Sequence, residues 1–185
     1  MTTPREAISE LHDAVVLWAV GYDSAGDVVR AACNALAAGV DGSSLAELAG
    51  VPLRQADTAV HEALPAALDE LGLPYYAQDS RESEAAALKV LATRAVAGEL
   101  SPRELADWTH RRFGHDRLPL AEPLAALDDE YDMLGYGPVS PSTTATAALD
   151  AEVLAEARRI LHVSPGVTAT TDSNDVGQVD AGPDE

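Results

Sequence analysis

The side chains best suited to chemistry are five consecutive residues, Asp128-Asp129-Glu130-Tyr131-Asp132, which bring four carboxylates together. In a helix, Asp128 and Asp132 lie on one face, because residues four apart are neighbours on the helix surface. Carboxylate oxygens are ligands that Mg²⁺ prefers, and Mg²⁺ commonly binds substrate phosphates at the same time. One hypothesis is therefore a small magnesium-dependent enzyme that uses this segment.

The same segment matches the DDxxD pattern with which prenyl-transferring and terpene-forming helical enzymes hold magnesium against diphosphate. A second magnesium motif on a facing helix is not apparent, and 185 residues are few for the large cavity such enzymes enclose. An acidic, solvated helix face is the favoured interpretation. We expect Asp128, Asp129 and Asp132 to contact a basic partner protein and to bind no metal ion.

Histidines offer a second possible metal site, formed by His110 and His115 with Asp116. His110 falls late in an expected helix and His115 follows Gly114 in a turn, so nothing in the sequence directs the two rings toward a common point. Cys33 is the single cysteine, which excludes an internal disulfide, and its helical setting predicts a small core residue. We assign no catalytic residue, no metal and no cofactor.

The densest aromatic and basic group in the chain includes Trp108, Arg111 and Arg112. Trp and Arg are favoured at the energetic centres of protein interfaces, so these residues are candidates for partner binding. The alternative places Trp108 in the core and lets the two arginines offset the negative end of the helix dipole.

Charge restricts the class of partner more firmly than any motif. The chain has 31 acidic and 12 basic residues, a net charge of −19, and removing the five acids of residues 164–185 still leaves −14. Such a surface repels phosphate backbones and anionic lipids, so we expect no nucleic-acid or membrane partner and a basic protein instead. Because the sequence shows neither a secretory signal nor about 20 consecutive apolar residues, we expect a cytoplasmic location. Arginine predominates over lysine and alanine is abundant, as in proteins of GC-rich bacteria.

The elements that must position these residues are all predicted to be helices, since alanine and leucine dominate and aromatic residues make up 4% of the chain. Three capping boxes mark helix starts: Thr3-Pro4-Arg5-Glu6, Ser44-Leu45-Ala46-Glu47 and Ser101-Pro102-Arg103-Glu104. Pro65 predicts a kink or break near Leu64 in a helix that reaches Leu71. The last helix is expected to start at Asp150, after a loop over 135–148.

We predict two small helical modules packed as a bundle, an N-terminal one over 1–74 and a C-terminal one over 84–163, joined by a polar linker. A disordered acidic tail is expected over 164–185. Residues 43–64 have a helix-turn-helix outline. Its second helix offers Arg54 and Gln55 but then Asp57 and Glu62, so a packing hairpin is favoured over DNA reading. A regulator derived from a helix-turn-helix remains an alternative.

Residues 88–162 carry a family resemblance. Four parts of this segment resemble small helical bacterial immunity proteins of the colicin-immunity type. They are the turn from Val96 to Ala106, the Trp-bearing helix after it, the helix with Leu127-Asp128-Asp129-Glu130-Tyr131 and the final helix with Leu149-Asp150-Ala151-Glu152-Val153-Leu154. The resemblance implies an acidic bundle that blocks a basic toxin, often a nuclease, by presenting carboxylates where the toxin expects phosphates. It covers under half of the chain and leaves the role of residues 1–74 open. The sequence thus favours a non-enzymatic, acidic protein-interaction module.

Overall fold

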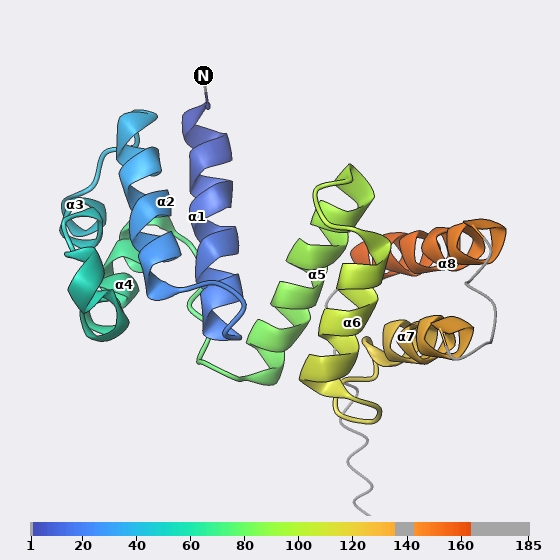
Figure 1. Ribbon diagram of the computed structural model, residues 1–185. Coiled ribbons are helices and arrows are strands. Elements are labelled where there is room, and N and C mark those ends of the chain that lie inside the picture. The colour runs from blue at the N-terminus through green and yellow to red at the C-terminus, as the bar shows by residue number, and fades with distance from the viewer. Residues whose placement is uncertain (1, 136–142, 164–185) are drawn as a thin grey trace, which may run out of the picture.

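The computed structural model describes residues 2–135 and 143–163, and these form an all-α fold, which confirms the predicted class (Figure 1). Over these ranges there is no strand, and one 3-10 turn, η1, accompanies the α-helices. The helices are α1 (Pro4–Ala19), α2 (Ala25–Ala37), α3 (Ser43–Ala49), η1 (Leu53–Gln55), α4 (Ala56–Leu71), α5 (Arg81–Ala97), α6 (Pro102–Phe113), α7 (Glu122–Gly135) and α8 (Thr143–His162). The predicted tail, 164–185, lies outside the described residues. None of the helices described is both long and apolar enough to cross a membrane.

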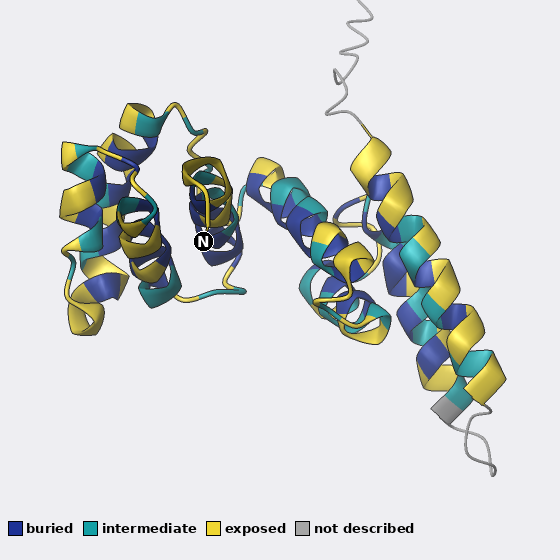
Figure 2. Cartoon of the chain, turned by 90° about the horizontal axis from the view of Figure 1, so that it is seen from above, coloured by how far each residue is buried: buried dark blue, intermediate teal, exposed yellow. Residues whose placement is uncertain are grey.

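Buried apolar side chains form two clusters. One is made by α1 to α4, with Leu11, Leu45 and Leu64 fully buried. The other is made by α5 to α8, together with Val16 and Leu17 from the far side of α1. Figure 1 shows the two helical units side by side, with α7 and α8 running across α5 and α6, and Figure 2 shows the buried faces turned inward. Because α1 contributes to both clusters, it joins the units by packing; the predicted boundaries at 74 and 84 stay a prediction.

Two of the three expected capping boxes are present. Glu6 and Glu104 each accept the backbone N–H of their cap residue, Thr3 at 2.7 Å and Ser101 at 3.0 Å. The box expected at Ser44 is wrong. The N-terminus of α3 is capped instead by a residue from the far end of α4, since the Glu70 carboxylate accepts the backbone N–H groups of Ser43 at 2.9 Å and Leu45 at 3.0 Å.

Gly42 makes room for this long-range cap. A Cβ at Gly42 would lie 2.9 Å from the Glu70 Cδ and closer still to its Oε2, nearer than ordinary van der Waals contact allows. The carboxylate therefore occupies the space that any larger residue would fill.

One helix is continuous where a kink or break was expected, and two helices begin earlier than expected. The α4 helix runs unbroken through Pro65, because Val60 and Leu68 are buried on either side of the proline and hold both halves in one core. The α8 helix begins at Thr143, so Asp150 lies inside it and caps nothing; alanines in this segment favour helix over the expected loop, of which 136–142 lies outside the described residues. The α5 helix begins at Arg81, three residues before the predicted start of the C-terminal module at 84, and Ser80 Oγ caps it by accepting the Ser83 N–H at 3.1 Å.

Candidate functional site

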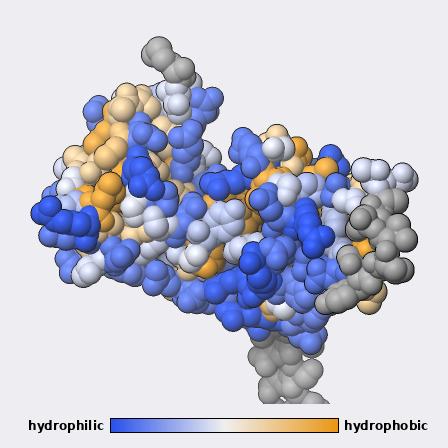
Figure 3. Space-filling model, in the orientation of Figure 1, coloured by the Kyte–Doolittle hydropathy of each residue, from blue (hydrophilic) through white to orange (hydrophobic). Residues whose placement is uncertain are grey.

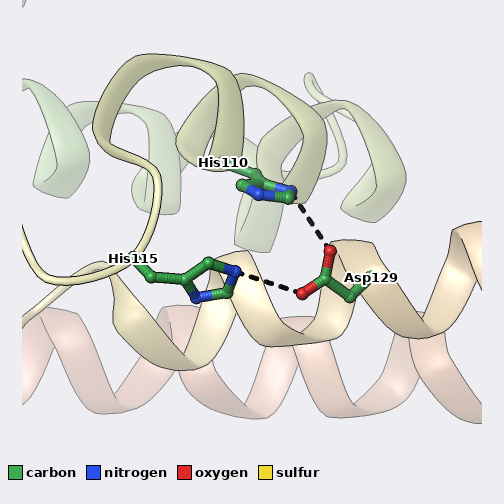
Figure 4. Close-up of side chains that lie close together, drawn as sticks. All are labelled: His110, His115 and Asp129. Atoms are coloured by element: carbon green, nitrogen blue, oxygen red, sulfur yellow. Dashed lines mark ion pairs between the residues drawn. The ribbon is translucent and has the colours of Figure 1, made fainter.

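Two histidines and three carboxylates converge where α6 meets α7. We call this group the His–carboxylate cluster: His110 on α6, His115 in the turn, and Glu122, Asp128 and Asp129 on α7. Figure 4 shows His110 and His115 directed at opposite oxygens of Asp129. The expectation that nothing brings the two rings together is therefore wrong.

The turn after α6 places His115. Gly114 ends the helix with φ +58°, a backbone conformation that favours glycine, and its N–H donates to the His110 carbonyl at 2.7 Å. Leu118, buried in the core, fixes the chain beyond the turn. The Glu122 carboxylate accepts the Asp116 backbone N–H at 3.2 Å, so the first residue of α7 holds the turn against its own helix.

Both ring nitrogens of His115 meet carboxylates. Nδ1 lies 2.9 Å from Glu122 Oε1, and Nε2 lies 3.1 Å from Asp129 Oδ2. The hydrogen bond with Glu122 is the largest cause that raises the pKa of His115, and the same hydrogen bond lowers the pKa of Glu122. The ring is consequently held in one orientation between two anionic groups.

His110 is half-buried and faces two neighbouring carboxylates of α7. Its Nδ1 lies 3.0 Å from Asp128 Oδ2 and 3.7 Å from Asp129 Oδ1. Asp128 is only 6% exposed, so its assignment to a solvated helix face is wrong. Its position explains the error, because Asp128 follows Leu124 by four residues and precedes Tyr131 by three, and both of these are buried on the same face of α7.

This arrangement can hold a positively charged ion. One ligand atom each from His110, His115 and Asp129 lies within 4.8 Å of the others, and the histidine ring centroids are 5.0 Å apart. Asp116, the acid expected to join the histidines, is exposed and contributes only its backbone N–H. Asp129, from the next helix, takes its place.

The segment that suggested magnesium does not present its aspartates to one open site. Asp128 faces His110, whereas Asp132 is exposed and lies 3.3 Å from the Arg103 guanidinium on α6. Arg103 also lies over the ring of Tyr131, at 5.0 Å from its centroid. Asp128, Asp129 and Asp132 thus contact α6, and substituting them would disturb this packing together with any partner contact.

The other three candidates for partner binding also make contacts within the chain. Trp108 is half-buried and meets Tyr22 edge-on, with ring centroids 5.5 Å apart. Arg111 is exposed and pairs with Asp107 of its own helix, while Arg112 pairs with Asp79 and with Glu84, the latter at 3.6 Å. A role of these residues in partner binding stays a prediction.

Glu84 is a functional group that the sequence did not reveal. It is 1% exposed in the first turn of α5 and pairs with Arg117 as well as with Arg112. These pairs tie α5 to the end of α6 and to the turn that carries His115.

Cys33 is exposed, so its assignment to the core is wrong. The buried residues of α2 include Val28, Ala32 and Ala35, and Cys33 lies outside that stripe with its Sγ 3.4 Å from the Ala49 carbonyl oxygen.

Comparison with known proteins gives no match: neither a family model, nor a curated protein, nor a solved structure matches this chain.

Proposed function

We propose that this protein is a non-enzymatic, acidic interaction module that binds a basic protein, with toxin immunity as its most concrete form. The observation that supports this proposal is a set of exposed carboxylates on α3 and α4, which we call the α3–α4 acidic surface. Within the part of the chain that the structure describes, these four side chains have no hydrogen bond or ion pair: Glu47, Asp57, Glu62 and Asp69.

Charge balance favours the N-terminal unit as the binding side. Residues 1–74 hold eleven acids and only three bases, and one of these bases, Arg30, already pairs with Asp27. Figure 3 shows hydrophilic side chains over both units on the face that it presents. An uncompensated negative surface accelerates association with a positively charged partner, and close charge pairs can add affinity.

The α7 carboxylates are less suited to this role than the α3–α4 acidic surface. Asp128 and Asp129 interact with histidines, and Asp132 lies beside Arg103. A partner would have to compete with these contacts, whereas the four carboxylates of the α3–α4 acidic surface make no such contact within the described residues.

A DNA-binding regulator is the weaker alternative. The η1 turn before α4 does expose Arg54 and Gln55, which could approach a nucleic acid, but Asp57 and Glu62 are exposed on α4 itself. Carboxylates at these positions would repel the phosphates that usually anchor a recognition helix.

The proposal can be tested with a charge-neutralised variant, Glu47→Gln/Asp57→Asn/Glu62→Gln/Asp69→Asn. Where a strongly basic protein is encoded beside this gene, that protein is the probe, tested by surface plasmon resonance at low and high salt. A matched control removes four exposed carboxylates of the C-terminal unit that have no ion pair among the described residues: Glu99→Gln/Asp116→Asn/Glu130→Gln/Glu152→Gln. Both variants change the net charge equally, so a difference between them reports the location of the binding surface.

We expect the first variant to bind roughly tenfold more weakly, mainly through slower association, and with a flatter salt dependence. The control should retain most of the affinity. Equal losses of affinity in both variants would refute a defined binding surface. Wild-type protein that does not bind the basic protein but binds a specific DNA sequence would favour the regulator.

A further inference from the structure

We propose that the His–carboxylate cluster is a binding site for one first-row transition metal ion of the Zn²⁺ class, with His110, His115 and Asp129 as its ligands. This site lies in the C-terminal unit and is independent of the α3–α4 acidic surface. It would add metal binding to a protein whose sequence alone predicted none.

The distances suit such an ion. Zinc binds imidazole nitrogen and carboxylate oxygen at about 2.0–2.2 Å, so two ligands at a tetrahedral angle lie about 3.4 Å apart. His115 Nε2 and Asp129 Oδ2 are already 3.1 Å apart. The three ligand atoms lie within 4.8 Å of one another, so small side-chain rotations of His110 would complete the site.

The group behind His115 is arranged as in known metal sites. A histidine ligand commonly donates its other ring N–H to a carboxylate, which fixes the ring and increases its basicity. Glu122 stands in that position toward His115, at 2.9 Å from Nδ1. Asp128, which is buried, contacts Nδ1 of His110 at 3.0 Å, the same nitrogen that faces Asp129, so it orients the ring toward α7 and would exchange this contact for the ion.

The ligand types select the class of ion. Two imidazoles suit zinc and related transition metals, whereas magnesium prefers a site made of oxygen atoms. Three carboxylates surround the two rings, and a divalent cation would offset their mutual repulsion. The His115 side chain is 43% exposed, so an ion can reach the site from solvent.

The test is isothermal titration of the full chain, first treated with a chelator, with ZnCl₂ as the probe. We expect one ion per chain. The affinity should fall at least tenfold in Asp129→Asn and in His115→Ala, and in Glu122→Gln it should fall by less, because the amide can still accept from the imidazole. Two matched controls should bind as the wild type does: Asp132→Asn, on the same helix, and His162→Ala, an exposed histidine at the end of α8.

The result that supports the proposal is a loss of zinc affinity in Asp129→Asn with unchanged helix content by circular dichroism. Wild-type protein that takes up no zinc would overturn it, and so would equal affinities in Asp129→Asn and Asp132→Asn, since the cluster would then be ion pairs alone. Displacement of zinc by an equal concentration of MgCl₂ would also overturn the assignment, because it would indicate an oxygen-only site.

Discussion

Replacing Glu84 by glutamine tests how the C-terminal unit is held together. The substitution preserves the volume of the side chain and removes its charge, so it creates no cavity. Arg112 and Arg117 would lose the carboxylate that they share, while the buried Nε of Arg112 already lacks a hydrogen-bond partner among the described residues. We expect a clear loss of stability for this reason.

The size of the loss follows from the exposure of the three side chains. Breaking a buried ion pair costs about 3–5 kcal/mol, whereas an exposed pair is worth about 0.2–1 kcal/mol. The Glu84 side chain is 2% exposed, but those of Arg112 and Arg117 are 26% and 50% exposed, so solvent compensates both arginines in part. An intermediate value of about 2 kcal/mol results, equivalent to a Tm lower by about 4–8 °C for a chain of this length.

Urea denaturation monitored by circular dichroism measures this loss, and Glu82→Gln is the matched control. Glu82 lies in the same first turn of α5 but is exposed and has no ion pair among the described residues, so its substitution isolates the effect on the helix dipole. We expect the control to stay within about 0.5 kcal/mol of the wild type. Equal losses of stability in both variants would contradict a buried ion pair, and so would a loss in Glu84→Gln that disappears in 0.5 M NaCl, as it would for a solvated pair.

Three further predictions concern other parts of the chain. Hydrogen bonds from the backbone of α3, the one from Leu45 being the largest cause, lower the pKa of Glu70. The cap therefore stabilises the fold above the pKa of Glu70 in the unfolded chain, and this stabilisation is lost as the pH falls through the pKa in the folded chain. Urea midpoints of Glu70→Gln should lie below those of the wild type at pH 7 and converge with them near pH 3, and a difference independent of pH would contradict this. Gly42→Ala should displace the same carboxylate, so adding it to Glu70→Gln should cost less than it does alone, which a double-mutant cycle measures. Tyr131→Phe removes the hydroxyl that donates to Asp150 at 2.5 Å, and we expect about 1 kcal/mol of lost stability in the same assay, unless solvent replaces that bond fully.

The fold class was predictable because the determinants of helix formation are local. The boxes at Thr3 and Ser101 contain their own partners within four residues, so the sequence alone specifies where α1 and α6 begin. The start of α3 was not predictable in this way. Its cap, Glu70, lies 27 residues from Ser43, and only the packing of α3 on α4 brings the two together.

The candidate metal site illustrates the same distinction within a shorter stretch. The sequence indicated both His110 and His115, but their convergence depends on a turn whose path no residue type specifies. The available signal was the expectation that two consecutive helices form a hairpin, which would place the aspartates of α7 near the end of α6. It could not distinguish Asp129, which faces both rings, from Asp116, which is closer in sequence.

The turn between α6 and α7 is held from both sides, and this relates the stability of the unit to the geometry of the site. From α5, Glu84 holds Arg117 at the end of the turn. From α7, Glu122 holds the backbone of Asp116 and the ring of His115. His115 therefore depends on contacts with two helices that are distant from each other in sequence. Such a residue is placed by the completed fold, which is why the sequence could indicate it only as a possible ligand and could not place it beside Asp129.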